Sequence, residues 1–148
     1  MKPRRAIFVL TMAVGIILVG CGPSTAPRTA RDVARGVALV ALDADQSATA
    51  ICHEATLTRE AGGNLKGARD LAKTCADGHR IVVDAAVAIK ASLGAWDDAE
   101  AGKAAQAACK GLGALTAMVS AVTDAGAKVP AVVADGIAAL GALGRNCK

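Results

Sequence analysis

From about residue 30 onwards, apolar residues recur every three or four positions, the spacing that places them on one face of an α-helix. The first such stretch runs from about Ala30 to Ala61. Gly62-Gly63-Asn64 follows it, and this combination is a helix stop and turn signal. The predicted buried stripe of this helix consists of Val33, Val37, Val40, Ala44, Ala48, Ile51 and Ala55.

Two further stretches have the same period. The second predicted helix runs from about Leu65 to Leu93, with a stripe formed by Ala68, Ala72, Cys75, His79, Val82, Ala86, Ile89 and Leu93. The third begins at Asp97, which is placed as its cap, and ends near Gly126. Its stripe contains Ala101, Ala105, Ala108, Leu112, Leu115, Val119 and Val122.

A fourth, shorter helix is predicted to begin with Pro130 as its first residue, because proline is well tolerated there. Its inward positions are Val133, Ile137, Leu140, Gly144 and Cys147. The connections are short, so helices adjacent in sequence should pack antiparallel to each other. The predicted fold class is therefore all-α, an antiparallel four-helix bundle over residues 29–148, with alanine and glycine allowing close packing.

The first 20 residues have a different pattern and are predicted to be a targeting segment. Lys2, Arg4 and Arg5 form a positive start, and residues 6–19 are apolar, which is too short for a comfortable bilayer span. The stretch ends in Leu18-Val19-Gly20-Cys21. This resembles the lipobox of bacterial lipoproteins, which implies a signal peptide over residues 1–20 and a diacylglyceryl group on the thiol of Cys21.

The resemblance also implies where the mature chain would be held. Lipoproteins are cut before the modified cysteine and acylated on its new amine, and several acyl chains anchor a protein stably to a membrane. Residues 21–28 would form the lipidated N-terminus and a flexible tether with two prolines. Gly22 stands where an aspartate would mark inner-membrane retention in enteric-type bacteria, so the expected location is the outer membrane of the cell envelope.

Charge and aromatic content narrow the classes of partner. Three of the 17 Lys and Arg residues lie in the first five positions, which leaves 14 basic against 13 acidic residues. These positive charges are scattered along the sequence, so no phosphate-neutralising patch for nucleic acid is predicted. Trp96 is the one aromatic residue after Phe8, so stacking platforms for bases or sugars are not expected either.

The four cysteines of the bundle allow three pairings, and hairpin geometry selects one of them. In two antiparallel helices, residues equidistant from the turn lie at the same height, because every residue rises by about 1.5 Å. Cys52 and Cys75 are centred on the predicted turn at Gly63-Asn64, and Cys109 and Cys147 are centred just before Pro130. We therefore predict the disulfides Cys52–Cys75 and Cys109–Cys147, as expected for an exported protein.

A metal site is the alternative use of the same residues. The ligands of this site would be Cys52, Cys75 and His79, with His53 as an additional candidate. Cysteine and histidine suit zinc or copper, and Cys75 and His79 are four residues apart on one helix face. The ordinary interpretation is that the cysteines are bridged, that His79 lies in the core or at its boundary, and that His53 is solvated. No bound cofactor is predicted.

Motifs for catalysis are missing, so no enzyme activity is expected. The sequence contains no GxSxG, P-loop or GxGxxG pattern. Asp43 with Asp45, and Asp97 with Asp98, are interpreted as solvated faces or caps rather than as catalytic carboxylate pairs.

Three functions remain open on this basis. The first is a lipid-anchored, non-catalytic binding or structural module with a protein partner in the envelope. The second is a periplasmic metal-binding helical protein. The third is a membrane-active or exclusion-type factor that would use the hairpin of the third and fourth helices, because uncharged runs occur at residues 112–123 and 136–144.

Overall fold

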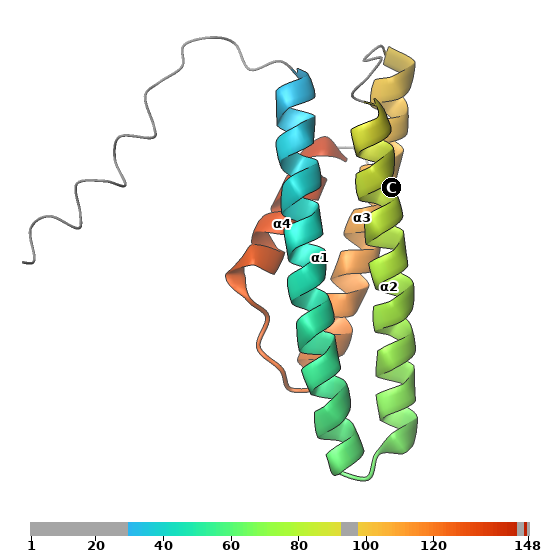
Figure 1. Cartoon of the computed structure of the whole chain (residues 1–148), viewed down its shortest axis with the longest axis vertical. Helices are drawn as coiled ribbons and strands as arrows, with labels where there is room; N and C mark the ends of the chain where they lie inside the picture. Colours follow the sequence, from blue (N-terminus) through green and yellow to red (C-terminus); the bar gives the residue numbers. More distant parts are fainter. Residues whose placement is uncertain (1–29, 93–97, 145–146, 148) are drawn as a thin grey trace, which may run out of the picture.

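The computed structural model describes residues 30–92, 98–144 and 147, and the regular structure in these ranges is entirely helical. The helices are α1 (Ala30–Ala61), α2 (Leu65–Ser92), α3 (Asp98–Asp124) and α4 (Ala131–Leu143) (Figure 1). The predicted all-α bundle is therefore confirmed. Predictions about Cys21, the tether, Trp96 and Asp97 lie outside the described residues.

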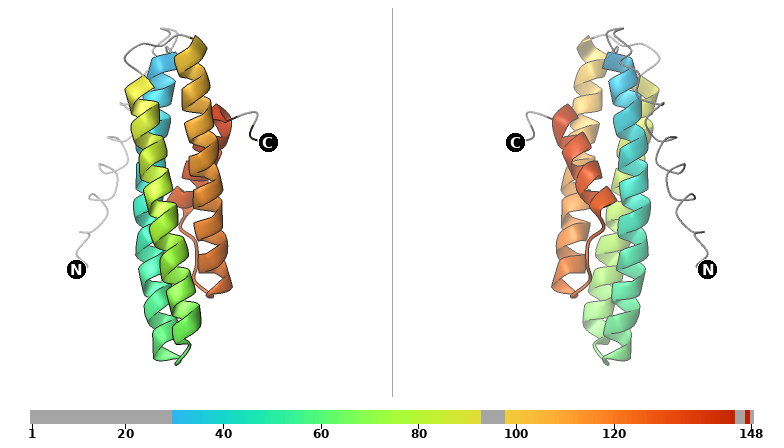
Figure 2. Two further views of the ribbon diagram at one scale, coloured as in Figure 1. Left: turned by 90° about the vertical axis from the view of Figure 1, so that its right-hand side faces the viewer. Right: turned by 90° about the vertical axis from the view of Figure 1, so that its left-hand side faces the viewer.

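The helices form a bundle in which each packs against its neighbours in sequence, and α4 also packs against α1. Figure 2 shows α1 and α2 along one side of the molecule and α3 and α4 along the other. Across the diagonals, α1 touches α3, whereas the described residues of α2 and α4 make no contact. The bundle is therefore closed into a ring of four helices, with its core between them.

The four helices differ greatly in length. α1 has 32 residues and α2 has 28, whereas α4 has only 13. In Figures 1 and 2 the turn between α1 and α2 extends past the lower ends of α3 and α4. The end of the α1–α2 hairpin therefore projects from the bundle, at the end away from the start of α1.

Glycines end α1 and α3 as their positions in the sequence predicted. Gly63 and Gly126 have positive φ angles of 74° and 85°, which a residue without a Cβ adopts without strain. After Gly63, the N–H of Asn64 donates to the carbonyl of Arg59 at 3.0 Å, the hydrogen bond of a Schellman cap. The side-chain oxygen of Asn64 then accepts the N–H of Gly67 at 2.9 Å and caps α2.

The core consists mainly of alanine, with a few larger side chains at its centre. Small residues bring the helices close together: a Cβ on Gly136 would meet the Cβ of Ala44, and a Cβ on Gly78 would meet the side chain of Met118. The largest fully buried apolar side chains are Ile89, Leu115, Met118, Leu140, Val82, Val122 and Val133. This agrees with the close packing that the alanine and glycine content predicted.

The buried faces are broader than the predicted stripes, because each helix in a four-helix ring touches two neighbours. Residues beside the stripes are buried as well, among them Ala34, Ala41, Leu71, Ala85, Ala104 and Met118. Ala72 and His79 lie on the predicted buried stripe of α2 but are exposed. Residues on the stripes that are only half buried are Val40, Ile51, Ala105, Leu112, Val119 and Ile137.

Both predicted disulfides are present, although one of the cysteines does not lie in a helix. Cys52 in α1 is joined to Cys75 in α2, and Cys109 in α3 is joined to Cys147. The prediction that Cys147 continues the fourth helix is wrong, because α4 ends at Leu143 and Gly144 leaves the helical conformation at φ −92° and ψ 40°. Pro130 is likewise not the first helical residue but the N-cap, at ψ 153°.

Candidate functional site

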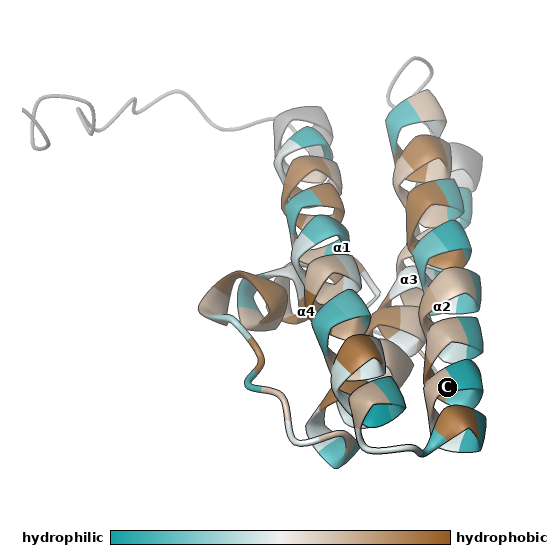
Figure 3. Cartoon of the chain, turned by 60° about the horizontal axis from the view of Figure 1, so that its bottom comes forward, coloured by the Kyte–Doolittle hydropathy of each residue, from teal (hydrophilic) through white to brown (hydrophobic). Residues whose placement is uncertain are grey.

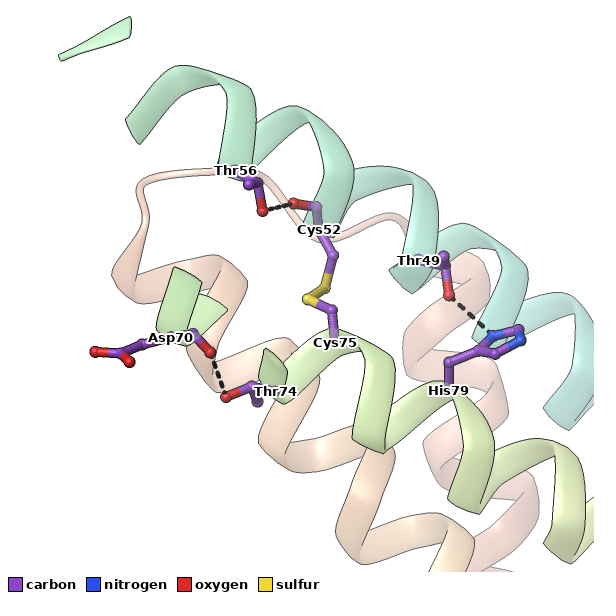
Figure 4. Close-up of a disulfide and its surroundings, with 7 residues drawn as sticks. All are labelled: Thr49, Cys52, Thr56, Asp70, Thr74, Cys75 and His79. Carbon is purple, nitrogen blue, oxygen red and sulfur yellow. Dashed lines mark hydrogen bonds between the residues drawn. A yellow bond between two sulfur atoms is a disulfide. The ribbon is translucent and has the colours of Figure 1, made fainter. Parts of the chain in front are cut away.

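A shallow groove of about 360 Å³ follows the seam between α1 and α2. It lies around the Cys52–Cys75 bond, which Figure 4 shows crossing between the two helices. The lining residues are Thr49, Cys52, His53, Thr56, Ala72, Cys75, Ala76 and His79. The α1 side of the groove carries polar side chains, the α2 side is formed by small residues and His79, and the disulfide fixes the width of the groove covalently.

The side chains of Asp45 and His79 are in contact next to this groove. Asp45 belongs to α1 and its side chain is only 2% exposed, whereas the imidazole of His79 from α2 is 48% exposed. The Oδ2 atom of Asp45 lies 2.7 Å from Nδ1 of His79. The carboxylate can accept a hydrogen bond from an N–H at this nitrogen of the imidazole.

The other oxygen of Asp45 is buried without a hydrogen-bond partner. Burial raises the pKa of the Asp45 carboxyl, because the charged form loses its hydration, and the charge and hydrogen bond of His79 offset part of this effect. Asp45 is thus a buried acid that has one partner where it could use two or more.

Thr49 completes the polar cluster, but it does not make a catalytic triad. Its Oγ1 lies 3.3 Å from Nδ1 of His79, the same nitrogen that faces Asp45. In a triad the hydroxyl and the carboxylate lie on opposite nitrogens of the imidazole. Figure 4 shows the second ring nitrogen of His79 pointing away from Thr49 and from the disulfide. The cluster is therefore an acid–imidazole pair at the edge of the groove.

The residues of the metal hypothesis line one groove, yet they do not form a ligand set. Cys52 and Cys75 are bonded to each other, and a disulfide offers no thiolate to a metal ion. His53 is exposed, and Nδ1 of His79 faces Asp45. Among the described residues, no three histidine, cysteine or acidic side chains are gathered as a metal ion would require.

A second groove, of about 440 Å³, runs along the seam between α2 and α3. Its rim contains an acid, Asp84, and the bases Lys103 and Lys110, with Gln106 between them. The rest of its lining is Ile81, Ala85, Ala88 and Ala107. This mixed surface is suited to contact with another protein and has no cluster of reactive groups.

The acidic pair Asp43 and Asp45 is separated in the fold, and Asp97 of the other pair lies outside the described residues. Asp43 is exposed, as predicted, but Asp45 is buried, and its interpretation as part of a solvated face is wrong. Asp45 is seven residues before Cys52 and His79 is four after Cys75, so both follow the helical faces that carry the disulfide. That spacing is the signal from which this pair could have been predicted.

Within the described ranges, no helix combines the length and apolar character that crossing a bilayer demands. Comparison of the chain with protein-family models, with functionally described proteins and with solved structures gives no match. The site must therefore be interpreted from its own chemistry.

Proposed function

We propose that this chain is a bacterial lipoprotein whose helical domain is a non-catalytic binding or structural module in the cell envelope. The observation that supports this most strongly is the pair of disulfides, Cys52–Cys75 and Cys109–Cys147, in a chain that starts with a lipobox-type signal. Disulfides persist in exported proteins and are rare in the reducing cytosol. Cys21 would carry the lipid, and the absence of aspartate at Gly22 favours the outer membrane.

The character of the surface supports binding rather than catalysis. The two grooves lie between helices that are held in place by packing, and in one of them by a covalent bond as well. A rigid surface loses little conformational freedom when a partner binds, so small contact areas suffice for recognition. The Asp45–His79 pair is best understood as part of the α1–α2 interface, because the acid lies inside it.

The anchor is tested by replacing Cys21 with serine in the full-length chain and supplying labelled fatty acid to the bacterial host. We expect Cys21→Ser to lose the label and to accumulate at the size of the uncut precursor, because a hydroxyl does not replace the thiol in lipid transfer. The matched control is the double variant Cys52→Ser/Cys75→Ser, which should keep the label. Normal labelling of Cys21→Ser would refute the proposed anchor.

A further inference from the structure

Large apolar side chains are concentrated on one side of the molecule. His53 and Ala76 line the α1–α2 groove, and residues 4, 7, 11, 14 or 18 positions away from them lie on the same side of their helices. Among the exposed large apolar residues, this rule places four on one surface, here named the α1–α2 face: Leu39, Leu57, Leu65 and Val87. They are 46–60% exposed. Figure 1 shows α1 and α2 in front of α3, and Figure 3 colours the same helices by the hydropathy of each residue.

These side chains form two pairs at opposite ends of the face. The Cys52–Cys75 bond fixes which residues of the two antiparallel helices are level with each other. Leu39 is then level with Val87 near the start of α1, whereas Leu57 and Leu65 both lie near the turn, with Leu65 about five residues closer to it. The two pairs are about 27 Å apart, since 18 residues of helix separate Leu39 from Leu57. An occupant must therefore be long or flat to contact both pairs.

The same face carries a positive charge. The spacing rule places four bases on it: Arg35, Arg69, Arg80 and Lys90. All four are exposed, and the same rule places one acid, Glu60, on this face. Within residues 34–92, the other acidic residues of α1 and α2 lie about a quarter turn or more away. One of them, Asp77, has its Oδ1 3.8 Å from the guanidinium of Arg80 and partly neutralises that base. The α1–α2 face therefore combines exposed apolar groups with a net positive charge.

We propose that the α1–α2 face lies flat on the anionic lipid surface to which Cys21 anchors the chain. Only eight residues separate Cys21 from α1, which limits the start of the helix to within about 30 Å of the bilayer. Bases close to a membrane surface are attracted by anionic lipid headgroups. The apolar pairs enter between the headgroups, and the anchor raises the local concentration, so this surface needs little affinity of its own.

This orientation determines which surface a protein partner could reach. With the α1–α2 face on the membrane, α3 and α4 and the α2–α3 groove remain open to the aqueous side. The inference rests on the proposed lipid anchor and adds to it the orientation of the domain.

The test is a photo-crosslinking amino acid placed at one of two glutamines in the full-length, lipidated chain. Gln46 lies on the α1–α2 face, seven residues before His53, whereas Gln106 lines the α2–α3 groove. Each purified protein is reconstituted into vesicles of phosphatidylethanolamine and phosphatidylglycerol. We expect the probe at Gln46 to couple to phospholipid several-fold more than the probe at Gln106. Vesicles of phosphatidylcholine alone should reduce this difference.

Charge reversal provides the matched control. Arg35→Glu/Lys90→Glu should abolish the excess coupling at position 46, whereas Lys110→Glu/Lys128→Glu, an equal change of charge elsewhere, should leave it unchanged. Circular dichroism checks that both variants remain helical. Equal coupling at positions 46 and 106, or coupling of position 46 to a protein instead of lipid in cells, would overturn the membrane face. Labelled fatty acid on Cys21 separates the two proposals: without label the anchor fails, and with label but no excess coupling only the orientation fails.

Discussion

Asp45 shows how costly one polar side chain is in a core made mostly of alanine. Its carboxyl is buried, one oxygen faces His79 and the other has no partner. A buried carboxylate with incomplete hydrogen bonding is destabilising compared with the same group in water. The raised pKa of Asp45 reflects this cost, because protonation removes the charge that burial penalises.

The pH dependence of stability follows from that raised pKa. The folded pKa of Asp45 lies above its unfolded value, so its contribution is most favourable at low pH and is lost as pH rises through the folded pKa. Asn cannot ionise and does not suffer this loss. We therefore expect the free energy of unfolding of Asp45→Asn, relative to wild type, to improve as pH rises from about 3 to 7, by urea denaturation. A difference independent of pH would contradict this.

The complementary variant is His79→Ala, which leaves Asp45 with neither oxygen partnered. It should lower the free energy of unfolding by about 1–3 kcal/mol near neutral pH. In the Asp45→Ala background the same change should cost much less, because no buried charge remains to lose its partner.

Glycines in α4 distinguish close packing from helix propensity. A Cβ on Gly136 would collide with the Cβ of Ala44, whereas a Cβ on Gly141 would meet no atom within 4 Å. Gly141→Ala should therefore raise the free energy of unfolding by up to about 1 kcal/mol, since alanine favours a helix. Gly136→Ala should lower it by about 1–3 kcal/mol despite the same gain in propensity. Thermal unfolding of both variants measures the contrast, and equal stabilisation would show that α4 does not pack tightly on α1.

At the scale of helices, the two disulfides support different elements. Cys52–Cys75 joins α1 and α2, which are long and pack along their length, whereas Cys109–Cys147 ties down a chain end beyond the short α4. α4 packs only on α1 and α3 within the described residues. The C-terminal bond should therefore matter most for local order in α4.

Removing each bond by a double alanine substitution tests this difference. The chain-entropy model gives a loss of about 3–4 kcal/mol for either bond. Hydrogen exchange should show the distinction: Cys109→Ala/Cys147→Ala should speed exchange of α4 amides far more than those of α1 and α2. Cys52→Ala/Cys75→Ala should not speed the exchange of α4 amides more than that of amides in the other helices. Uniform acceleration across all helices in both variants would mean that α4 is not a separate weak element.

The helices and the cysteine pairing were predictable because both depend on local rules. Glycine at positions 63 and 126 marks a helix end whatever surrounds it, and a constant rise per residue converts the distance from a turn into height. The end of α4 at Leu143 was missed because Cys147, seven residues after Leu140, fits the helical spacing and extends the pattern past Gly144. Gly144 directly after the last helical residue is nevertheless a stop signal of the same local kind.

At the scale of the whole molecule, the burial of Asp45 and the α1–α2 face both depend on how the helices are assembled. Whether a polar residue on a stripe is buried depends on which neighbour covers it, and Asp43 and Asp45 look alike until α2 is in place. The bases at positions 35, 69, 80 and 90 are scattered along the sequence, so no charge run reveals them. The antiparallel packing of α1 and α2, in the register that the Cys52–Cys75 bond fixes, brings these bases to one side of the molecule.

The two disulfides also change how the domain would respond to mechanical force. If Cys21 is fixed in a membrane and something pulls on the C-terminal end, the load passes from α1 through Cys52–Cys75, along residues 75–109 and through Cys109–Cys147. The segments bypassed have sequence separations of 23 and 38 residues. About half of the described chain therefore cannot be drawn out by tension, however far the packing fails. The projecting hairpin end and α4 both belong to the shielded half, so the protein behaves as a short tether with two covalently closed loops.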